Sequence, residues 1–393
     1  MTQSPPVAPG WPVFAADERE AVDTVLASGK VNYWTGENGR EFEREYASAL
    51  GVSHAIALMN GTVALELALR MWGVGPGDEV VVTPRSFIAS ISCVVQQGAR
   101  PVFADVDKDS GNLTAATIER VLTDRTKAIV LVHLGGWPCE MDEIMALADS
   151  LGIKVIEDCA QAHGAAYKGR EVGSMGHAAT FSFCQDKIIT TGGEGGLLVT
   201  NDADLWERAW AYKDHGKSYQ AVYQREHPPG FRWLHESFGT NWRMTELQAA
   251  IGRIQLRKLP GWGARRRAHA ALLQAELEAT PGLRTPQAPA YARHGHYRYY
   301  AFLDVARLRS GWTRDRVVSE VSARGAPCFS GSCSEIYREK AFSDSGLAPR
   351  EPLATAHELG ETSLALLVHP TLEDVHVRRT AEVLRSVLTD AID

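Results

Sequence analysis

Residues 154–196 decide the fold of this chain, and they read KVIEDCAQAHGAAYKGREVGSMGHAATFSFCQDKIITTGGEGG. The stretch contains two apolar segments of strand length, Lys154 to Glu157 and Ala179 to Phe183. Asp158 follows the first segment directly, and Lys187 comes shortly after the second. A glycine-rich turn, Gly192 to Gly196, then leads into another strand and is too short to contain a helix. The strands before and after that turn are therefore expected to pair antiparallel, at or near a sheet edge.

The sequence on both sides of this stretch repeats the same alternation. From about residue 50 to 200, short β-branched runs alternate with stretches of helical apolar spacing, which is typical of crossover units on a mostly parallel sheet. The other strands are expected at 54–58, 79–83, 100–104, 128–133 and 196–200. The helices between them are expected at 63–72, 88–97, 115–122 and 142–151. We therefore predict an α/β domain.

The C-terminal part of the chain has a different pattern. A long helix is predicted from Thr245 to Lys258, and Pro260-Gly261 is expected to stop or kink it before a second helix with basic residues. Further on, residues 297–305 are strand-like, and residues 314–323 and 375–391 are helical. A length of 393 residues is enough for two or three domains. We expect two: a large α/β domain over residues 1–260, including the N-terminal arm, and a smaller α+β domain over residues 261–393.

Composition and charge exclude several classes of protein. The 41 Lys and Arg residues against 48 Asp and Glu residues give a net charge of −7, which offers no general attraction to nucleic acid or anionic membranes. No apolar run approaches the roughly 18–20 residues that a membrane helix needs. Residues 1–10 lack the basic and apolar regions of a secretory signal. The six Cys residues include no Cys-x-x-Cys pair and are interpreted as reduced thiols, so we expect a cytoplasmic protein.

The common nucleotide and metal motifs do not account for the chain. No Gly-x-Gly-x-x-Gly follows the first strand, and Gly216-Lys217-Ser218 is preceded by Ala211, where a P-loop requires Gly. His294 and His296 could hold a metal, but they have no Asp, Glu or Cys partner close by in the sequence. We therefore predict no metal site.

Three other segments each offer a group that a phosphorylated cofactor could use. Asn60-Gly61-Thr62 lies between a strand and a helix, where backbone N–H groups and the helix dipole favour a phosphate. The alternative interpretation is a simple N-cap in which Thr62 bonds to its own helix. Asp158 ends a buried strand, where a carboxylate is costly unless it is paired. The protonated ring nitrogen of pyridoxal phosphate is one such partner, and capping of the following turn is the alternative.

Lys187 supplies the third group. A lysine after an apolar strand and beside flexible glycines is a candidate amine for a Schiff base, and Ser182 could reach the same phosphate. Taken alone, Lys187 is better explained as a solvated loop lysine. The order of an anion site, an Asp at a strand end and a Lys 29 residues later (187 − 158) favours the cofactor interpretation.

At this point the sequence resembles a known family, the DegT/StrS-like pyridoxal-phosphate sugar aminotransferases of fold type I. The resemblance covers nearly the whole chain. Besides the Lys187 segment, it is carried by YWTG (33–36), NGTVAL (60–65), PRSF (84–87), EDCAQAHG (157–164), NWRMTELQAA (241–250) and HPTL (369–372). The segment before Lys187, FCQD, departs from the commoner pattern, as does the long loop from His227 to Ser237.

The resemblance implies a role for each matching residue. Lys187 would join the cofactor covalently, and Asp158 would pair with the pyridinium nitrogen. Phe87 would stack on one face of the ring, and Gln161 would cover the other. The phosphate would be held by Gly61, Thr62 and Ser182, with Asn241 contributed by the partner subunit. That last role implies a homodimer with shared active sites.

The resemblance also implies the reaction. Glutamate or glutamine would donate an amino group, and the acceptor would be a keto-sugar, most often nucleotide-linked, in amino-sugar biosynthesis. The cationic candidates for the substrate are Arg243, Arg232, Lys217 and Arg298. A keto-cyclitol is an alternative acceptor. A sugar dehydratase is a further alternative, but known members replace the Schiff-base Lys with His; a non-catalytic cofactor-binding protein predicts loss of Lys187 or Asp158, and both are present.

Overall fold

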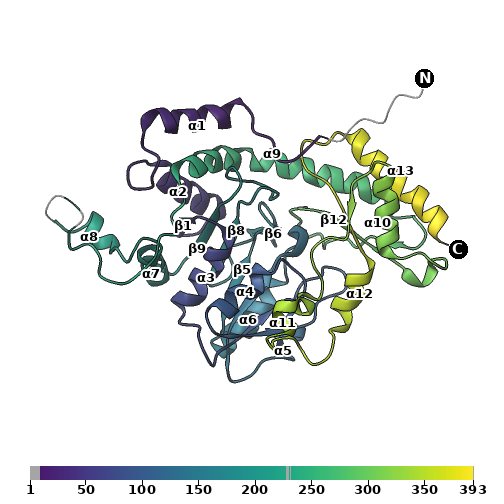
Figure 1. Ribbon diagram of the computed structural model, residues 1–393, viewed down its shortest axis with the longest axis horizontal. Helices are drawn as coiled ribbons and strands as arrows, with labels where there is room; N and C mark the ends of the chain where they lie inside the picture. Colours follow the sequence, from purple (N-terminus) through teal and green to yellow (C-terminus); the bar gives the residue numbers. More distant parts are fainter. Residues whose placement is uncertain (1–8, 227–229, 231, 393) are drawn as a thin grey trace.

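The computed structural model describes residues 9–226, 230 and 232–392, and its largest element is a seven-stranded sheet (Figure 1). The strands lie in the order β1-β9-β8-β5-β4-β2-β3. Only β9 runs antiparallel to its neighbours. The bounds are β1 His54–Leu58, β2 Glu79–Val82, β3 Arg100–Phe103, β4 Thr126–Val132, β5 Lys154–Asp158, β8 Ala178–Ser182 and β9 Gly196–Thr200. The predicted α/β sheet is confirmed, and so is the antiparallel pair near its edge.

Both faces of this sheet are covered, because alternate residues of each strand feed different cores. Ile56 and Leu58 of β1 pack with α3 and α7, whereas Ala55 and Ala57 pack with α2. The helices of the large domain are α1 Ala16–Ser28, α2 Asn38–Leu50, α3 Gly61–Met71, α4 Ala89–Gln96, α5 Ala115–Glu119, α6 Met141–Leu151, α7 Ala203–Lys213 and α8 Tyr219–Tyr223. The four predicted crossover helices correspond to α3, α4, α5 and α6. The sequence interpretation did not include α1, α2, α7 or α8.

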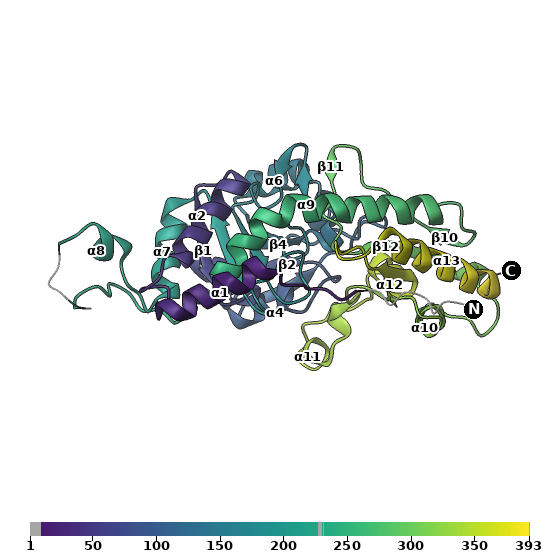
Figure 2. The same ribbon diagram turned by 90° about the horizontal axis from the view of Figure 1, so that it is seen from above.

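One long helix, α9 Glu246–Leu277, corrects the prediction around Pro260. Thr245 caps its N-terminus, since the Thr245 side chain accepts a hydrogen bond from the backbone N–H of Gln248. The helix then continues through Pro260, so the separate second helix that we expected is not formed. Its first half packs on α1 and α2 and its second half on α13, Asp374–Ala391, so contacts on both sides of the proline hold it together (Figure 2). The expected boundary between domains therefore falls inside one helix.

The C-terminal region forms a second, smaller sheet. Its four antiparallel strands lie in the order β10 Leu283–Arg284, β12 Tyr299–Leu303, β14 Ser363–Leu366 and β13 Cys328–Phe329. Side chains of α9, α10 Arg314–Ala323 and α13 pack on it around Leu303, Val317, Leu364 and Leu384. The remaining helices are α11 Lys340–Ser343 and α12 Ala354–Thr362, with short 3-10 turns at Leu134–Gly136, Val305–Arg307 and Ile336–Arg338. The expected α+β arrangement is observed.

A third sheet and the loop around residue 230 complete the chain. The small sheet pairs β11 Ala292–Arg293 with β6 Ala166–Tyr167, which pairs with β7 Arg170–Glu171. The loop expected at His227–Ser237 lies partly outside the described residues. Next to it, α8 lies at the periphery of the sheet domain in both views, and its Tyr219 and Tyr223 pack on Trp210 of α7 (Figures 1 and 2). Among the described residues, no helix is long and apolar enough to cross a membrane.

Candidate functional site

A cavity of about 580 Å³ lies between the end of the large sheet and the small domain. The large domain contributes Phe87, Gln161 and Lys187 to its wall, and the small domain contributes Tyr297 and Arg298. The residues from the large domain follow the carboxyl ends of parallel strands, where open α/β sheets place their ligands. The cavity therefore brings together residues that are distant in the sequence.

Lys187 reaches the cavity from the turn that follows β8. Its side chain is only 16% exposed, and its Nζ lies 3.2 Å from Asp186 Oδ1 and 5.1 Å from the centre of the Tyr297 ring. Burial alone would lower the pKa of this amine, but Tyr297 and Asp186 outweigh burial, and the pKa is raised. Lys187 is therefore a held side chain at a cavity wall and not a solvated loop lysine.

Asp158 is buried at the last position of β5, and β5 is the direct neighbour of β8 in the sheet. Its Oδ2 accepts a 2.7 Å hydrogen bond from Ser90 Oγ, and its Oδ1 accepts one of 3.1 Å from the backbone N–H of Ala160. The second bond is the turn cap considered above, so the two interpretations of Asp158 coexist. Burial raises the pKa of the carboxyl group despite these bonds, and the positive charge of Lys187 acts in the opposite direction. A cationic ligand would relieve this cost of burial.

The N-terminus of α3 packs closely against the end of β8. Asn60 caps the helix, since its Oδ1 accepts a 3.0 Å hydrogen bond from the backbone of Val63; the cap is thus Asn60, not Thr62. A Cβ on Gly61 would lie 2.8 Å from the Cβ of Ser182, and one on Gly196 would lie 2.1 Å from the Asn60 carbonyl oxygen. Thr62 stands in the first turn of the same helix. Gly61, Thr62 and Ser182 therefore meet at a helix N-terminus, which suits an anion.

Phe87 and Gln161 differ in how firmly they are held. Phe87 is 68% exposed, so its ring offers an uncovered apolar face at the cavity. Gln161 is buried, and its Oε1 accepts a 2.8 Å hydrogen bond from the Gly135 backbone. Its Nε2 donates to Ser332 Oγ at 3.4 Å. Gln161 thus ties the cavity wall to the small domain.

The groups at this edge of the sheet fit pyridoxal phosphate in their chemistry. A buried carboxylate without a cationic contact among the described residues suits the protonated ring nitrogen, and the α3 N-terminus suits the phosphate. Lys187 offers an amine.

Three of the four cationic candidates for the substrate lie away from this cavity. Arg243 Nη1 and Lys217 Nζ both approach Oδ1 of the buried Asp214, at 2.6 and 3.1 Å. Arg232 is exposed on the loop beyond α8, and only Arg298 lines the cavity. Asn241 is likewise exposed, and its backbone pairs with that of Asp214. Within one chain, therefore, Arg298 is the candidate that the fold brings to Lys187.

Sequence reasoning missed several residues that support the site. Ser90 lies in α4, and its hydroxyl is 2.9 Å from that of Ser86 as well as bonded to Asp158. His163 connects Tyr46 Oη, at 2.7 Å, to the Ser182 carbonyl oxygen, at 2.9 Å, and burial lowers its pKa to about 3. Ser86 precedes α4, so its four-residue spacing from Ser90 was the only available signal for the first pair. The second pair joins distant segments and had none.

The neighbour of Asp158, Glu157, has the opposite environment. It is fully buried, accepts hydrogen bonds from the backbone N–H groups of Gly173, Met175 and Gly176, and lies 3.1 Å from His133 Nε2. Burial opposes its charge, but these partners outweigh burial and lower its pKa. Cys159 lies close to this pair, yet both carboxylate oxygens are already engaged. The cluster therefore serves to anchor the end of β5.

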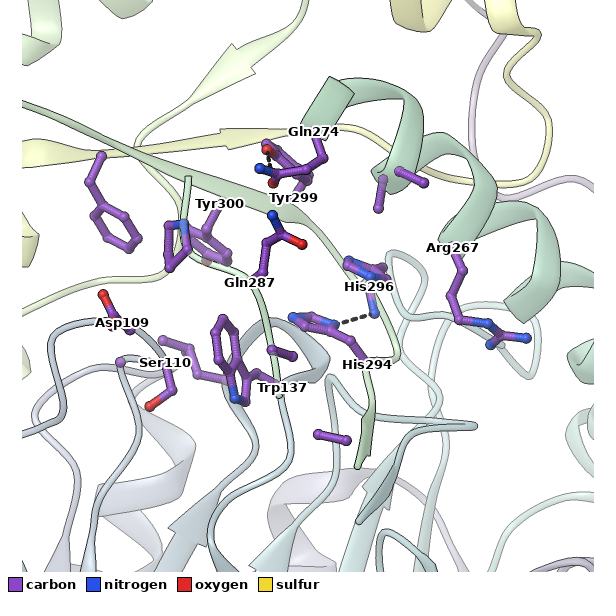
Figure 3. A pocket seen from close by; sticks show the side chains of 18 of the residues that line it. Asp109, Ser110, Trp137, Arg267, Gln274, Gln287, His294, His296, Tyr299 and Tyr300 are labelled. Atoms are coloured by element: carbon purple, nitrogen blue, oxygen red, sulfur yellow. Dashed lines mark hydrogen bonds between the residues drawn. The ribbon is translucent and has the colours of Figure 1, made fainter. Parts of the chain in front are cut away.

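A second cavity, of about 450 Å³, is also lined by Tyr300, which it shares with the first (Figure 3). His294 and His296 face it as a parallel stack with ring centres 3.9 Å apart, and such a stack does not direct two ring nitrogens at one metal ion. Polar side chains around it bond to one another, as Tyr299 Oη does to Gln274 Oε1 at 2.9 Å. The pair is therefore explained by packing.

Comparison with known proteins agrees with this geometry. The sequence pattern of the DegT/DnrJ/EryC1/StrS aminotransferase family matches residues 12–385. The crystal structure of an aminotransferase from Psychrobacter cryohalolentis is 54% identical in sequence and superposes with a TM-score of 0.95, covering 98% of this chain and 99% of that chain.

The names of two curated relatives state the compound that each makes or acts on. GDP-perosamine synthase from Caulobacter vibrioides is 36% identical, covering 99% of this chain and 100% of its own length. L-Glutamine:2-deoxy-scyllo-inosose aminotransferase from Streptomyces lividus is 40% identical, covering 76% of this chain and 72% of its own. One relative is named for a nucleotide-linked sugar and the other for a cyclitol.

Proposed function

The chain belongs to the DegT/DnrJ/EryC1/StrS aminotransferase family, and we propose that it uses pyridoxal 5′-phosphate to move an amino group from glutamate or glutamine to a nucleotide-linked keto-sugar. The fold is that of the fold-type I aminotransferases. The observation that carries the proposal is the position of Lys187 at the cavity wall beside the buried Asp158, at the ends of two adjacent parallel strands.

In this proposal the chain's residues hold the cofactor at four points. Lys187 joins it covalently, Asp158 bonds to the ring nitrogen, and Gly61, Thr62 and Ser182 bind the phosphate. Phe87 and Gln161 cover the two faces of the ring and exclude water from it. When bound, the protonated pyridine ring withdraws electrons from the carbon that loses its proton.

The proton transfers are assigned to Lys187. Once its amine is released, it removes a proton from one carbon and returns it to another, as general base and then general acid. Asp158 has a single task, which is to keep the ring nitrogen protonated. Ser90 supports that task, because its hydroxyl orients one carboxylate oxygen and leaves the group charged.

A nucleotide-linked acceptor needs positive charge for its diphosphate, and Arg298 at the cavity wall is our candidate. Arg243, Arg232 and Lys217 are retained as candidates for a site completed by a second copy, since none lines the cavity of its own chain. Asn241 is proposed to reach the phosphate of the partner's cofactor. The exposed Trp233 and the 98% exposed Phe238 near it support a homodimer formed through this region.

A keto-cyclitol acceptor remains the second candidate, because the inosose aminotransferase is 40% identical to this chain. We also retain the division into residues 1–260 and 261–393, which is supported by the separate core around Leu303 and Leu364 although α9 crosses the boundary. The six cysteines are all free, which supports a reducing, cytoplasmic compartment.

The proposal is tested in two half-reactions. The protein loaded with pyridoxal phosphate is first treated with glutamate or glutamine, and the visible absorbance of the bound cofactor is expected to disappear. Nucleotide keto-sugars and keto-cyclitols are then added singly, and the true acceptor restores the absorbance. Lys187→Ala is expected to abolish both changes, while Lys168→Ala, which removes an exposed lysine elsewhere, leaves them intact. A wild-type protein that takes up no pyridoxal phosphate contradicts the proposal.

A further inference from the structure

The side chain in contact with the Lys187 amine is the carboxylate of the preceding residue, Asp186. Its Oδ1 lies 3.2 Å from Lys187 Nζ, and its Oδ2 accepts a hydrogen bond from the hydroxyl of Tyr297. All three side chains line the cavity between the domains. The proposed function gives Asp186 no role.

Tyr297 is itself firmly placed, so it can orient the carboxylate. Its backbone N–H donates a 2.8 Å hydrogen bond to the Gly135 carbonyl oxygen, in the same turn that holds Gln161. Its ring is buried and has the Arg298 guanidinium 4.6 Å from its centre. The Asp186 carboxylate is therefore held between two domains, unlike a flexible side chain on a loop.

We propose that Asp186, oriented by the Tyr297 hydroxyl, is a positioning residue that holds the Lys187 side chain as an ammonium ion whenever it is not joined to the cofactor. The ammonium donates an N–H···O hydrogen bond to Oδ1, and the proton stays on nitrogen. The inference rests on the proposed function of Lys187.

This contact has a consequence for proton transfer. An amine held beside a carboxylate keeps its proton more strongly, so Lys187 is favoured as the proton donor and must leave Asp186 to act as a base. The other titratable groups that act on the Lys187 amine are Cys184 in its own turn, Asp158 on β5 and His163 after β5. Of these, Asp158 and Cys184 favour the ammonium form of Lys187, and His163 stays neutral. Substitutions of Asp186 and Tyr297 are therefore the ones that test the proposal.

The test measures the protonation of Lys187 directly, without cofactor or sugar. The full chain is freed of cofactor with hydroxylamine and labelled with trinitrobenzenesulfonate between pH 7 and 11. Mass spectrometry of the Lys187 peptide then gives the labelling rate and its apparent pKa. In Asp186→Asn, we expect labelling at pH 8 to be at least roughly threefold faster than in the wild type, because the apparent pKa falls by half a unit or more. Tyr297→Phe should shift the titration in the same direction, but less.

A matched control comes from an exposed pair, Lys168 and Asp142, whose Nζ and Oδ2 lie 2.8 Å apart. Asp142→Asn should alter labelling of Lys168 and leave that of Lys187 unchanged. An unchanged Lys187 titration in Asp186→Asn, in a variant that keeps the wild-type circular dichroism, overturns the inference. Because the assay needs no cofactor, this failure is distinct from failure of the proposed function, which is decided by uptake of pyridoxal phosphate.

Discussion

The indole Nε1 of Trp11 donates a 2.8 Å hydrogen bond to the backbone carbonyl oxygen of Lys187, across 176 positions of sequence. The Trp11 ring also packs edge-on against Trp262 of α9 and lies 5.2 Å from the Arg266 guanidinium. Just before it, the Gly10 carbonyl oxygen accepts a hydrogen bond from Thr371 of the small domain. The N-terminal arm therefore connects the turn of Lys187 to both domains.

Trp11→Phe should retain most of the ring packing and lose this bond. A hydrogen bond of this kind contributes about 1 kcal/mol, so we expect roughly a fivefold fall in kcat with KM nearly unchanged. Steady-state kinetics with the acceptor that the half-reaction screen identifies would measure it. Trp312→Phe, which changes a ring packed on Arg316 in the small domain, is the control and should leave kcat unaffected. Equal kcat in both variants would show that the bond does not position Lys187.

Adjacent carboxylates at the end of β5 should respond to pH in opposite ways. The pKa of Glu157 is lowered, so its stabilisation is complete above the unfolded value of about 4.3 and is lost as the pH falls through the lower folded value. Glu157→Gln should therefore destabilise the protein at pH 7, by roughly 1–3 kcal/mol, and much less near pH 3. Thermal melts of the cofactor-free protein across pH would show this trend.

Asp158→Asn should behave differently in the same melts. Burial raises the pKa of Asp158, so the charged group costs stability above its folded value, and the cost disappears as the pH falls below the unfolded value of about 3.9. The cofactor-free variant should thus melt at or above the wild-type temperature at pH 7. Transamination, in contrast, should fall at least roughly a hundredfold. A variant that is less stable but fully active would remove Asp158 from its proposed role.

Gly61→Ala tests the close approach of α3 to β8. The added Cβ would lie 2.8 Å from Ser182 Cβ, so the helix end must shift away from the phosphate position. Overpacking of this kind costs about 1–3 kcal/mol. We therefore expect the dissociation constant of pyridoxal phosphate, measured by absorbance titration, to rise by roughly tenfold or more. Gly261→Ala is the matched control: it has nothing within 4 Å and lies inside α9, so it should stabilise the protein by about 0.5–1 kcal/mol.

Shared active sites can be tested with two inactive variants. Lys187→Ala removes the amine from its own chain, and Asn241→Asp places a negative charge where the partner's phosphate is proposed to bind. If the sites are shared, each mixed dimer contains one intact site, and a 1:1 mixture recovers about one quarter of the wild-type activity. A mixture that stays inactive, although the subunits exchange, would show that Asn241 serves its own chain.

The central sheet could be predicted from sequence because its strands are continuous apolar runs. Val80, Val81 and Val82 are fully buried on both faces, and such runs differ clearly from amphipathic helices. Helix α1 was missed because its apolar residues do not form one clear face; Leu26 is exposed although Val25 is buried. Helix α9 was cut short because local rules give Pro260 more weight than the packing on α1, α2 and α13 that holds the helix together.

The candidate site shows the same division. Asp158 ends a strand, and Lys187 and Gly61 follow strand ends, so their convergence could be inferred from topology alone. The engagement of Arg243 and Lys217 with Asp214 could not, because nothing in the local sequence shows that Asp214 is buried at that point. Tyr297 was missed for a similar reason: its hydroxyl meets Asp186 only when the small domain is folded against the large one.

The 32 residues of α9 correspond to a stiff element about 48 Å long. Because both domains are built onto it, one domain cannot swing away from the other as it could on a flexible tether. Bending is easiest near Pro260, where the ring removes a hydrogen-bond donor from the helix. We therefore expect the cavity between the domains to change little in width, and its fixed walls to limit the size of the acceptor that can bind.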